Sequence, residues 1–412
     1  MSEILFLSHR IPWPPDRGDK IRSHHVLKRL AALAPVHVAT FAEDEIDLAW
    51  EPQLAVTARS YLLQQRCKPL ALAGIEALGT GRPISLTAFH DRPMKRWIEA
   101  TLASRPISTF FVFSGQMAQY VPENYAGRLV IDFVDVDSAK FDAYADVSRW
   151  PLSWAHAREG RLLSAEESRL AATADASLLV SSDEAALFTA RLRPEHRAAA
   201  RILSIGNGID TRLFDPREVE PEPRLAALPP TRLIFTGQMD YPPNIAAAVR
   251  AATRIMPRIR AAVPEATFHV VGRKPTAEVR ALDGVNGCSV WGEVADVRPW
   301  LRGADIALVP LDIARGVQNK VLEAMAMTVP VVASPQAATG IPATAARDIA
   351  VGLNDADLAG AVLRLITDPH MAKAMGLAAR RFVEREHDWE AMLAPLAGLI
   401  DAPLRRTRRH AA

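Results

Sequence analysis

Residues 316–328 of this 412-residue chain, GVQNKVLEAMAMT, combine polar side chains that could bind a ligand with apolar ones that could pack. At 100° per residue, the apolar residues share one side of a helix: Val321, Leu322 and Met325. The polar residues share the other side: Gly316, Asn319, Lys320 and Glu323. Because the apolar side must cover a sheet, the polar side faces either solvent or a binding cleft.

Lys320 and Glu323 stand three residues apart, and this spacing fits two interpretations. On a solvated face they would form one ion pair worth a few tenths of a kcal/mol. In a cleft they would bind a nucleotide, because the predicted helix opens at Gly316 with free N–H groups and a positive dipole end that favour a phosphate. Lys320 would add charge to that phosphate, and Glu323 would accept hydrogen bonds from the two hydroxyls of a ribose. A diphosphate followed by a ribose describes a nucleotide-sugar.

Short apolar runs alternate with stretches of helical period such as 20–34 and 153–174, which predicts two doubly wound α/β domains in series. In the first half the predicted strands are 4–8, 36–41, 109–113, 129–134, 177–181 and 201–205. After a proline-rich segment at 215–231, which is either an exposed linker or a loosely packed excursion, they are 232–237, 267–272, 288–292, 305–310 and 330–334. Ligands of such parallel sheets lie outside the carboxyl ends of the strands. The loops after each run are therefore where we expect the site.

The first of these loops, PPDRGDK, contains Gly18 just before the helical stretch at 20–34. A glycine there would let the backbone pass close to a donor phosphate, although an ordinary turn glycine explains it equally well. Its charged neighbours Asp16, Arg17 and Asp19 could contact an acceptor or a phosphate.

Composition excludes several classes of protein. Lys and Arg number 49 against 47 Asp and Glu, so the net charge of +2 is far from that of a general nucleic-acid binder. With Cys67 and Cys288 as its only cysteines, the chain has neither a disulfide framework nor a thiolate zinc site. The first residues lack a basic n-region, and no stretch of 18 apolar residues occurs. We therefore expect a cytoplasmic protein whose membrane contact, at the inner membrane, would be peripheral.

Several segments resemble one known family. The string GVQNKVLEAMAMTVPVVAS resembles the signature helix of the retaining GT-B glycosyltransferases of family 4, in which a glutamate holds the donor ribose. NGID at 207–210 resembles the family's interdomain crossover, and FTG at 235–237 and VVG at 270–272 resemble its first strand ends in the second domain. The opening SHRIPWPPDRGDKIRSHH and the segment DFVDVDS resemble the sugar transferases of exosortase and exopolysaccharide systems in Gram-negative bacteria.

The resemblance implies two Rossmann-like domains facing a cleft, with a glycan or lipid-linked acceptor on the first and a nucleotide-sugar on the second. We expect the domains at 1–205 and 206–385, a helix at 386–402 that crosses back to the first domain, and a basic tail at 403–412. It also implies a metal-independent hexosyltransferase with no cofactor beyond the nucleotide-sugar co-substrate. Helix ends and basic side chains would stabilise the negative charge of the leaving diphosphate. We therefore expect no metal ion at the segment DVD, residues 135–137.

The family often has a histidine beside the reacting sugar, at a place where this chain has three carboxylates: Asp132, Asp135 and Asp137. Asp135 is our first candidate for steering the acceptor hydroxyl, and Asp137 is a further acceptor-side candidate. Capping or structural roles also fit the cluster.

The chain departs from the family pattern at the phosphate and sugar contacts. The first of two family glutamates is replaced by Arg315, and an arginine and a lysine that normally follow Gly237 are replaced by Gln238 and the string DYPPN. The cations available in their place are Arg273, Lys274, Arg315 and Lys320. Arg273 and Lys274 also fit a solvated surface role, since strand-end loops often carry such residues.

These departures keep two alternatives open. The chain could be a glycosyltransferase-like binding or scaffolding subunit that has lost activity. It could also be a nucleotide-sugar 2-epimerase of the same fold, although it lacks an evident set of catalytic carboxylates and histidines. A short basic amphipathic stretch at 92–102 and the arginine-rich tail could be solvated faces or could touch acidic lipid.

Overall fold

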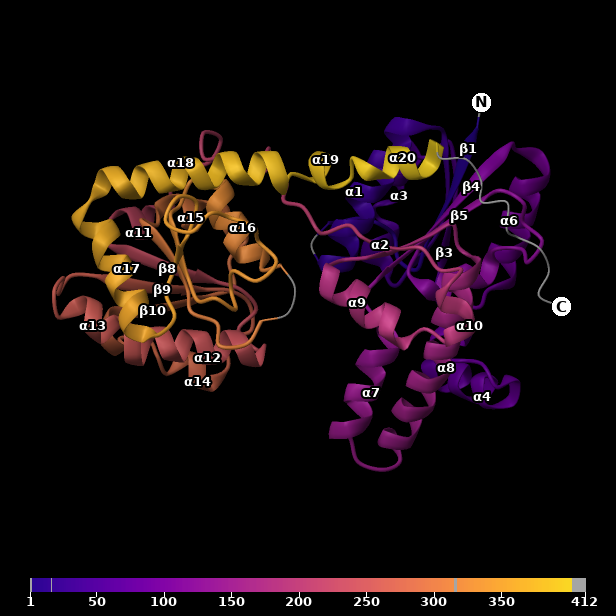
Figure 1. The fold of residues 1–412 in the computed structure, drawn as a ribbon, viewed down its shortest axis with the longest axis horizontal. Helices are drawn as coiled ribbons and strands as arrows, with labels where there is room; N and C mark the ends of the chain where they lie inside the picture. Colours follow the sequence, from indigo (N-terminus) through magenta and orange to yellow (C-terminus); the bar gives the residue numbers. More distant parts are fainter. Residues whose placement is uncertain (1, 16, 315–316, 402–412) are drawn as a thin grey trace. The chain divides into compact units, whose positions relative to one another are not determined.

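The computed structural model describes residues 2–15, 17–314 and 317–401, and the chain forms two compact units (Figure 1). Of the described residues, the first unit holds those up to 206 and those at 393–401, and the second holds those within 207–392. Our predicted division lay between 205 and 206. The predicted basic tail lies outside the described residues, together with three candidate site residues: Asp16, Arg315 and Gly316.

The first unit is built on a seven-stranded sheet in the order β3-β2-β1-β4-β5-β6-β7, with every neighbouring pair parallel. Its strands are β1 (Glu3–Ser8), β2 (Val36–Ala42), β3 (Ser60–Gln65), β4 (Ile107–Phe113), β5 (Arg128–Val134), β6 (Ala176–Leu179) and β7 (Ile202–Ser204). The central strands read as continuous apolar runs because helices cover both faces of the sheet. Strand β3 was not predicted, because this half-buried edge strand, SYLLQQ, lacks such a run.

Long helices of the first unit include α1 (Gly18–Leu33), α6 (Arg92–Ser104) and α8 (Leu152–Thr173). On α6, Met94 and Ile98 are buried and Trp97 packs on the core, so the apolar side of the stretch at 92–102 is occupied by the protein itself. Its basic residues remain exposed, as a solvated helix face requires.

The second unit has a six-stranded parallel sheet in the order β10-β9-β8-β11-β12-β13. Its strands are β8 (Arg232–Thr236), β9 (Thr267–Val271), β10 (Cys288–Gly292), β11 (Ile306–Val309), β12 (Val331–Ala333) and β13 (Ala350–Val351). Helices α12 (Pro242–Arg250), α16 (Asn319–Ala326), α17 (Asp355–Thr367) and α18 (Pro369–Glu386) contribute buried side chains to its core. The two-residue strand β13 was too short to predict.

The segment at 215–231 lies inside the second unit, where most of its residues are at least partly exposed and α11 (Pro223–Ala226) buries Leu225 completely. It is therefore the loosely packed excursion rather than the linker. The crossing helix expected at 386–402 is two short helices, α19 (Trp389–Met392) in the second unit and α20 (Pro395–Asp401) in the first. A proline disfavours helical backbone in the residue before it, so Pro395 separates them.

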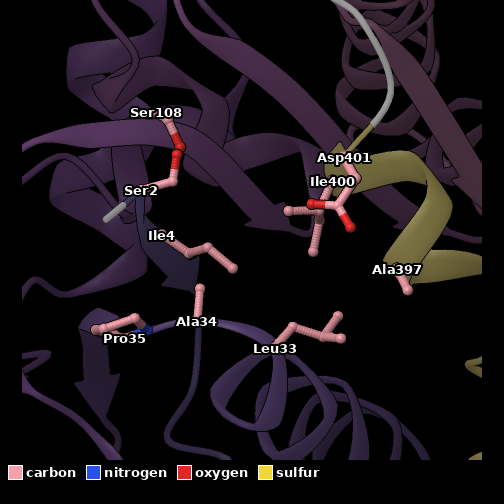
Figure 2. A pocket seen from close by; sticks show the side chains of 9 residues that line it. All are labelled: Ser2, Ile4, Leu33, Ala34, Pro35, Ser108, Ala397, Ile400 and Asp401. Atoms are coloured by element: carbon pink, nitrogen blue, oxygen red, sulfur yellow. The ribbon is translucent and has the colours of Figure 1, made fainter.

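Helix α20 packs against α1 and borders a pocket of about 310 Å³ (Figure 2). The pocket lies beside the amino ends of β1 and β4, where Ile4 and Ser108 line it. Ligands of open parallel sheets bind at the opposite, carboxyl edge, where the strand order reverses. That point falls between β1 and β4 in the first unit and between β8 and β11 in the second.

Candidate functional site

Two glycines shape the carboxyl edge of the second sheet. A Cβ added to Gly272, after β9, would lie 1.6 Å from the carbonyl oxygen of Gly237, after β8, so the backbones can approach only without it. Gly237 has φ +150°, and a Cβ there would meet Asn244 Nδ2 and Lys320 Nζ at 3.0 Å each. The glycine at 237 therefore makes room for a lysine that comes from a different strand crossover.

Helix α16 supplies that lysine, but it begins later than we predicted. Gln318 is the N-cap with extended backbone, and the first helical residue is Asn319 rather than Gly316. Side-chain periodicity identifies the faces of a helix without fixing its first residue, which depends on backbone conformation. The predicted apolar face is confirmed, because Val321, Leu322 and Met325 are fully buried.

The Lys320 ammonium is held in place by two contacts. Nζ donates to Asn244 Oδ1 at 2.5 Å and lies 4.5 Å from the centre of the Phe235 ring. Burial lowers the pKa of Lys320 to about 8, against the opposing effect of Glu323. Lys320 is therefore mostly charged at neutral pH and poorly hydrated, which strengthens its attraction to an anion.

Glu323 lies one helical turn further along α16. Among the described residues its carboxylate forms no ion pair and accepts no side-chain or backbone hydrogen bond. Burial raises the pKa of Glu323 to about 7, although Lys320 favours the charged form. Lys320 and Glu323 therefore do not form the ion pair of the first interpretation, and a half-buried carboxylate without a partner and with a raised pKa is typical of a functional site.

Asn244 belongs to this cluster, although the sequence did not lead us to it. It is buried in the first turn of α12, where Nδ2 donates to the Gln238 carbonyl oxygen at 2.9 Å while Oδ1 accepts from Lys320. The pair of prolines before it marks a helix start in the sequence. No sequence pattern, however, indicates that a residue 76 positions away will meet it.

The other predicted donor-binding residues, two cations and Asn319, are exposed around this cluster. Arg273 is exposed and donates from Nη2 to Gln238 Oε1 at 3.0 Å, so it lies beside the residue that replaces the family's arginine. Lys274 is exposed with φ 54° and donates no hydrogen bond to a described residue. Asn319 is exposed at the start of α16. Both interpretations of Arg273 and Lys274 remain compatible with these positions.

In the first unit, Asp132 is structural. Its carboxylate is fully buried and accepts from Arg22 Nε at 2.9 Å and Nη2 at 3.3 Å. Arg22 also donates to the carbonyl oxygen of Gly206 at 3.2 Å. An acceptor could not reach Asp132, so of the three carboxylates it has the capping or structural role that we left open.

Asp135 and Asp137 lie where a ligand could reach them. Val134, at the end of β5, has φ 68°, a strained conformation for a β-branched residue and typical of functional loops. Asp135 after it is exposed, and Asp137 opens α7 (Asp137–Val147) half-buried. Burial raises the pKa of Asp137, which Lys140 opposes from 3.9 Å.

The acceptor-side candidates near α1 form an ion-pair network with residues that follow β1 and β2. Asp19 accepts from Arg10 Nη1 at 2.6 Å and lies 3.5 Å from His9 Nε2, while Glu43 pairs with Arg10 at 2.9 Å and Arg17 at 3.1 Å. Burial alone would raise the pKa of Asp19, but the contacts with His9 and Arg10 lower it below its usual range. We did not predict His9, Arg10 and Glu43 as site residues, although all three closely follow predicted strands.

Gly18 is the first residue of α1, and the protein itself does not require a glycine there. An added Cβ would meet nothing within 4 Å, and the backbone is not left-handed. This position is compatible with both interpretations of Gly18, a turn glycine and a glycine beside a bound ligand. Among the residues that the structure describes, no three His, Cys, Asp or Glu side chains are grouped closely enough to hold a metal ion.

Comparison with known families matches residues 230–368 to the model described as glycosyl transferases group 1. Over these residues the second unit is similar to the glycosyl transferases group 1 family. The matched residues contain both glycines, Asn244, Lys320 and Glu323. The cluster described above therefore lies entirely within the matched residues.

A curated relative of this chain comes from Corynebacterium glutamicum. It is the GDP-mannose-dependent monoacylated alpha-(1-6)-phosphatidylinositol monomannoside mannosyltransferase, 31% identical over 217 residues. The match covers 48% of this chain and 55% of the relative, so the chain spans about half the length of the curated relative that it matches.

Solved structures match both units. Sucrose-phosphate synthase from Thermosynechococcus elongatus is 19% identical with a TM-score of 0.64, over 97% of this chain and 98% of that one. The HepE protein of Anabaena in complex with UDP is 13% identical with a TM-score of 0.62, over 98% and 100%. A glycosyltransferase from Rickettsia africae is 12% identical with a TM-score of 0.62, over 98% and 99%. The predicted fold is confirmed: the chain has the GT-B fold.

Proposed function

We propose that this protein is a retaining, metal-independent glycosyltransferase that moves a sugar from a nucleotide-sugar to a glycan or lipid-linked acceptor. One observation carries the proposal. At the carboxyl edge of the second sheet, a partly desolvated Lys320 ammonium and an unpaired Glu323 carboxylate lie one helical turn apart among the described residues, beside glycines that leave the backbone bare. These groups suit a diphosphate and a ribose diol.

The donor would bind in the second unit. Lys320 would neutralise the diphosphate, with help from Arg273, while Glu323 accepts hydrogen bonds from the ribose. That HepE was solved with UDP, and that the Corynebacterium relative is named for GDP-mannose, supports a nucleoside diphosphate sugar as donor. The two names differ in their base, so both bases belong in the first binding experiment.

In the transfer step, the acceptor oxygen would bond to the anomeric carbon as the bond from that carbon to the diphosphate oxygen breaks. Attack on the face from which the diphosphate leaves would retain the anomeric configuration. The acceptor's hydroxyl proton would leave with the nucleoside diphosphate. The protein contributes by positioning the reactants and stabilising the leaving charge, in which Lys320 has the main part.

The acceptor would bind to the first unit, with Asp135 our candidate for orienting its hydroxyl. The Corynebacterium relative's name includes a phosphatidylinositol mannoside, which supports a lipid-linked acceptor. Such an acceptor would place the protein at a membrane surface, as expected of exopolysaccharide synthesis on the cytoplasmic face. None of the described helices is both long and apolar enough to cross a membrane.

A thermal-shift panel of UDP, GDP, ADP and their sugar conjugates tests the donor site on the wild type and on Glu323→Ala. A ligand at 100 times its Kd adds about 2.7 kcal/mol to the free energy of unfolding. We expect one nucleotide to stabilise the wild type and not the variant. If none does, the proposal fails and a scaffolding subunit becomes the better explanation.

The reaction class needs a separate measurement. Release of free nucleoside diphosphate only when acceptor is present would support transfer, whereas interconversion of sugar nucleotides without acceptor would indicate a 2-epimerase. The anomeric configuration of the product tests retention. Activity lost in chelator and restored by Mg²⁺ or Mn²⁺ would contradict the metal-independent mechanism.

A further inference from the structure

Exposed apolar side chains are concentrated on two elements of the first unit. Of nineteen large apolar side chains exposed among the described residues, nine belong to these elements. Four lie on α4 (Leu70–Thr80): Leu70, Leu72, Ile75 and Leu78. Five lie at the tip of the helical hairpin made by α7 and α8: Tyr144, Val147, Trp150, Leu152 and Trp154. We call these nine residues the hairpin patch.

The two parts of the hairpin patch adjoin each other. Arg158 on α8 donates from Nη2 to the Ala77 carbonyl oxygen of α4 at 2.6 Å, and Trp154 lies one turn before Arg158 on the same face of α8. Glu159 next to it accepts from the backbone N–H of Ile84 at 2.7 Å, just after α4. Figure 1 shows the hairpin projecting from the sheet of the first unit with α4 beside α8.

Polar contacts hold the base of the hairpin. Ser138 of α7 donates to Glu167 of α8 at 2.5 Å, and Arg191 pairs with Asp142 at 2.5 Å. A Cβ added to Gly160 would lie 2.3 Å from Asp142 Oδ1, so the helices approach closely there. The side chains at the tip are not needed for these contacts. Trp150 is 81% exposed and Val147 83%, so both display their apolar surface to solvent.

The charges around the hairpin patch are mostly positive once internal ion pairs are set aside. Asp142 pairs with Arg191, and Glu76 of α4 pairs with Lys68 at 2.8 Å. On these elements two exposed arginines, Arg149 and Arg161, and one exposed carboxylate, Asp146, form no ion pair with a described residue. Arg158 and, just after α4, Arg82 are half-buried and donate to oxygens of the protein itself. The patch therefore complements a negatively charged surface.

We propose that the hairpin patch docks this protein on the surface of an anionic phospholipid bilayer. Tryptophan and tyrosine prefer the boundary between headgroups and acyl chains, where their rings are partly apolar and partly wet. The leucines, isoleucine and valine would enter the acyl region, and Arg149 and Arg161 would contact lipid phosphates. This proposal adds a membrane partner to the proposed function. It rests on that function in one respect: a lipid-linked acceptor would explain why the protein docks on a bilayer.

Flotation of the full chain with phosphatidylcholine vesicles, with and without about one third phosphatidylglycerol, tests the docking. We expect the protein to float with the anionic vesicles and to dissociate at high salt. The double variant Trp150→Gln/Trp154→Gln should bind these vesicles at least about tenfold more weakly, because it removes both rings from the interface. The double variant Arg149→Gln/Arg161→Gln should lose about as much, since each arginine near an anionic surface contributes about fivefold.

Leu353→Gln is the matched control. Leu353 is 78% exposed and lies in the second unit, so its loss should leave vesicle binding unchanged. No binding by the wild type, or unchanged binding by both double variants, would overturn the proposal. It would also be overturned if the wild type dimerised in solution and Trp150→Gln/Trp154→Gln dissociated the dimer, because a second copy would then cover the patch.

The same samples separate failure of docking from failure of the proposed function. The double variants should keep the nucleotide-induced thermal shift, which also shows that they fold. Glu323→Ala should lose that shift and still float with vesicles.

Discussion

Lys320 Nζ donates to Asn244 Oδ1 at 2.5 Å and, within the part of the chain that the structure describes, forms no ion pair with Glu323, its neighbour one turn along α16. An ion pair would have neutralised the Lys320 and Glu323 charges against each other on the surface of the helix. Instead the ammonium is fixed over the Phe235 ring and the carboxylate is left for another partner. In the free protein, burying these two charges without an ion pair between them is unfavourable, and a bound donor would supply the missing partners. The following predictions test this arrangement.

Glu323→Gln should stabilise the free protein while weakening donor binding. The folded-state pKa of about 7 lies above the ordinary value of 4.5, so the native state holds a proton that the unfolded state has lost between these pH values. Stability therefore falls as pH rises through this window. Removing the charge should add up to about 3 kcal/mol at pH 8 and little below pH 4.5. Urea unfolding at both pH values measures this, and an equal effect at both would contradict it.

Donor affinity should depend on pH through the same pair. Below pH 7 the fraction of ionised Glu323 falls about tenfold per unit, and above pH 8 Lys320 loses its proton, so affinity should be greatest between these values. Calorimetric titration with a sugar nucleotide, whose diphosphate does not titrate in this range, gives the profile. In Glu323→Gln the acid limb should disappear. An unchanged acid limb would show that another group causes it.

Lys320→Met should lower kcat by about 10²- to 10³-fold, as loss of one group that stabilises a leaving anion typically does. The fold should tolerate the change, because methionine fills the space above Phe235 without a buried charge. Lys373→Ala, at an exposed lysine of the same unit, is the control and should leave kcat unchanged. Wild-type kinetics in Lys320→Met would remove Lys320 from the mechanism.

Gly237→Ala and Gly18→Ala should behave differently. At Gly237 the new Cβ meets Lys320 and a strained backbone, which should cost about 1–3 kcal/mol of stability and also donor affinity. At Gly18 the Cβ enters open space, so the melting temperature should not fall. If Gly18 borders the donor phosphates, kcat/KM should nevertheless decrease. A fully active Gly18→Ala variant would leave Gly18 as an ordinary turn glycine.

Asp132→Asn and Asp135→Asn should separate a structural from a functional carboxylate. Asp132→Asn leaves the Arg22 charge buried without its partner, which should destabilise the protein by about 3–5 kcal/mol. Asp135→Asn changes an exposed side chain and should leave the melting temperature within about 1 °C of wild type. We expect it instead to raise the acceptor KM or lower kcat. No kinetic effect would remove Asp135 from the acceptor site.

The sequence determined the fold class and most strands, because buried parallel strands need continuous apolar runs and the crossing helices need a period of 3.6 residues. It also identified Lys320 and Glu323, since their polar face stands opposite Val321 and Leu322 on one helix. Strand β3 and the start of α16 escaped prediction. A half-exposed edge strand carries little pattern, and a helix boundary depends on backbone conformation that side-chain type does not fix.

Tertiary structure alone decided which residues meet. Asn244 reaches Lys320 across 76 positions, and Asp132 is committed to Arg22 across 110, because strand order brings distant loops to one sheet edge. It also decided that the apolar face of α6 is buried while that of the α7–α8 hairpin is displayed. A one-dimensional pattern gives the amphipathicity of a helix, but whether an apolar face finds a protein partner depends on the packing of the whole unit.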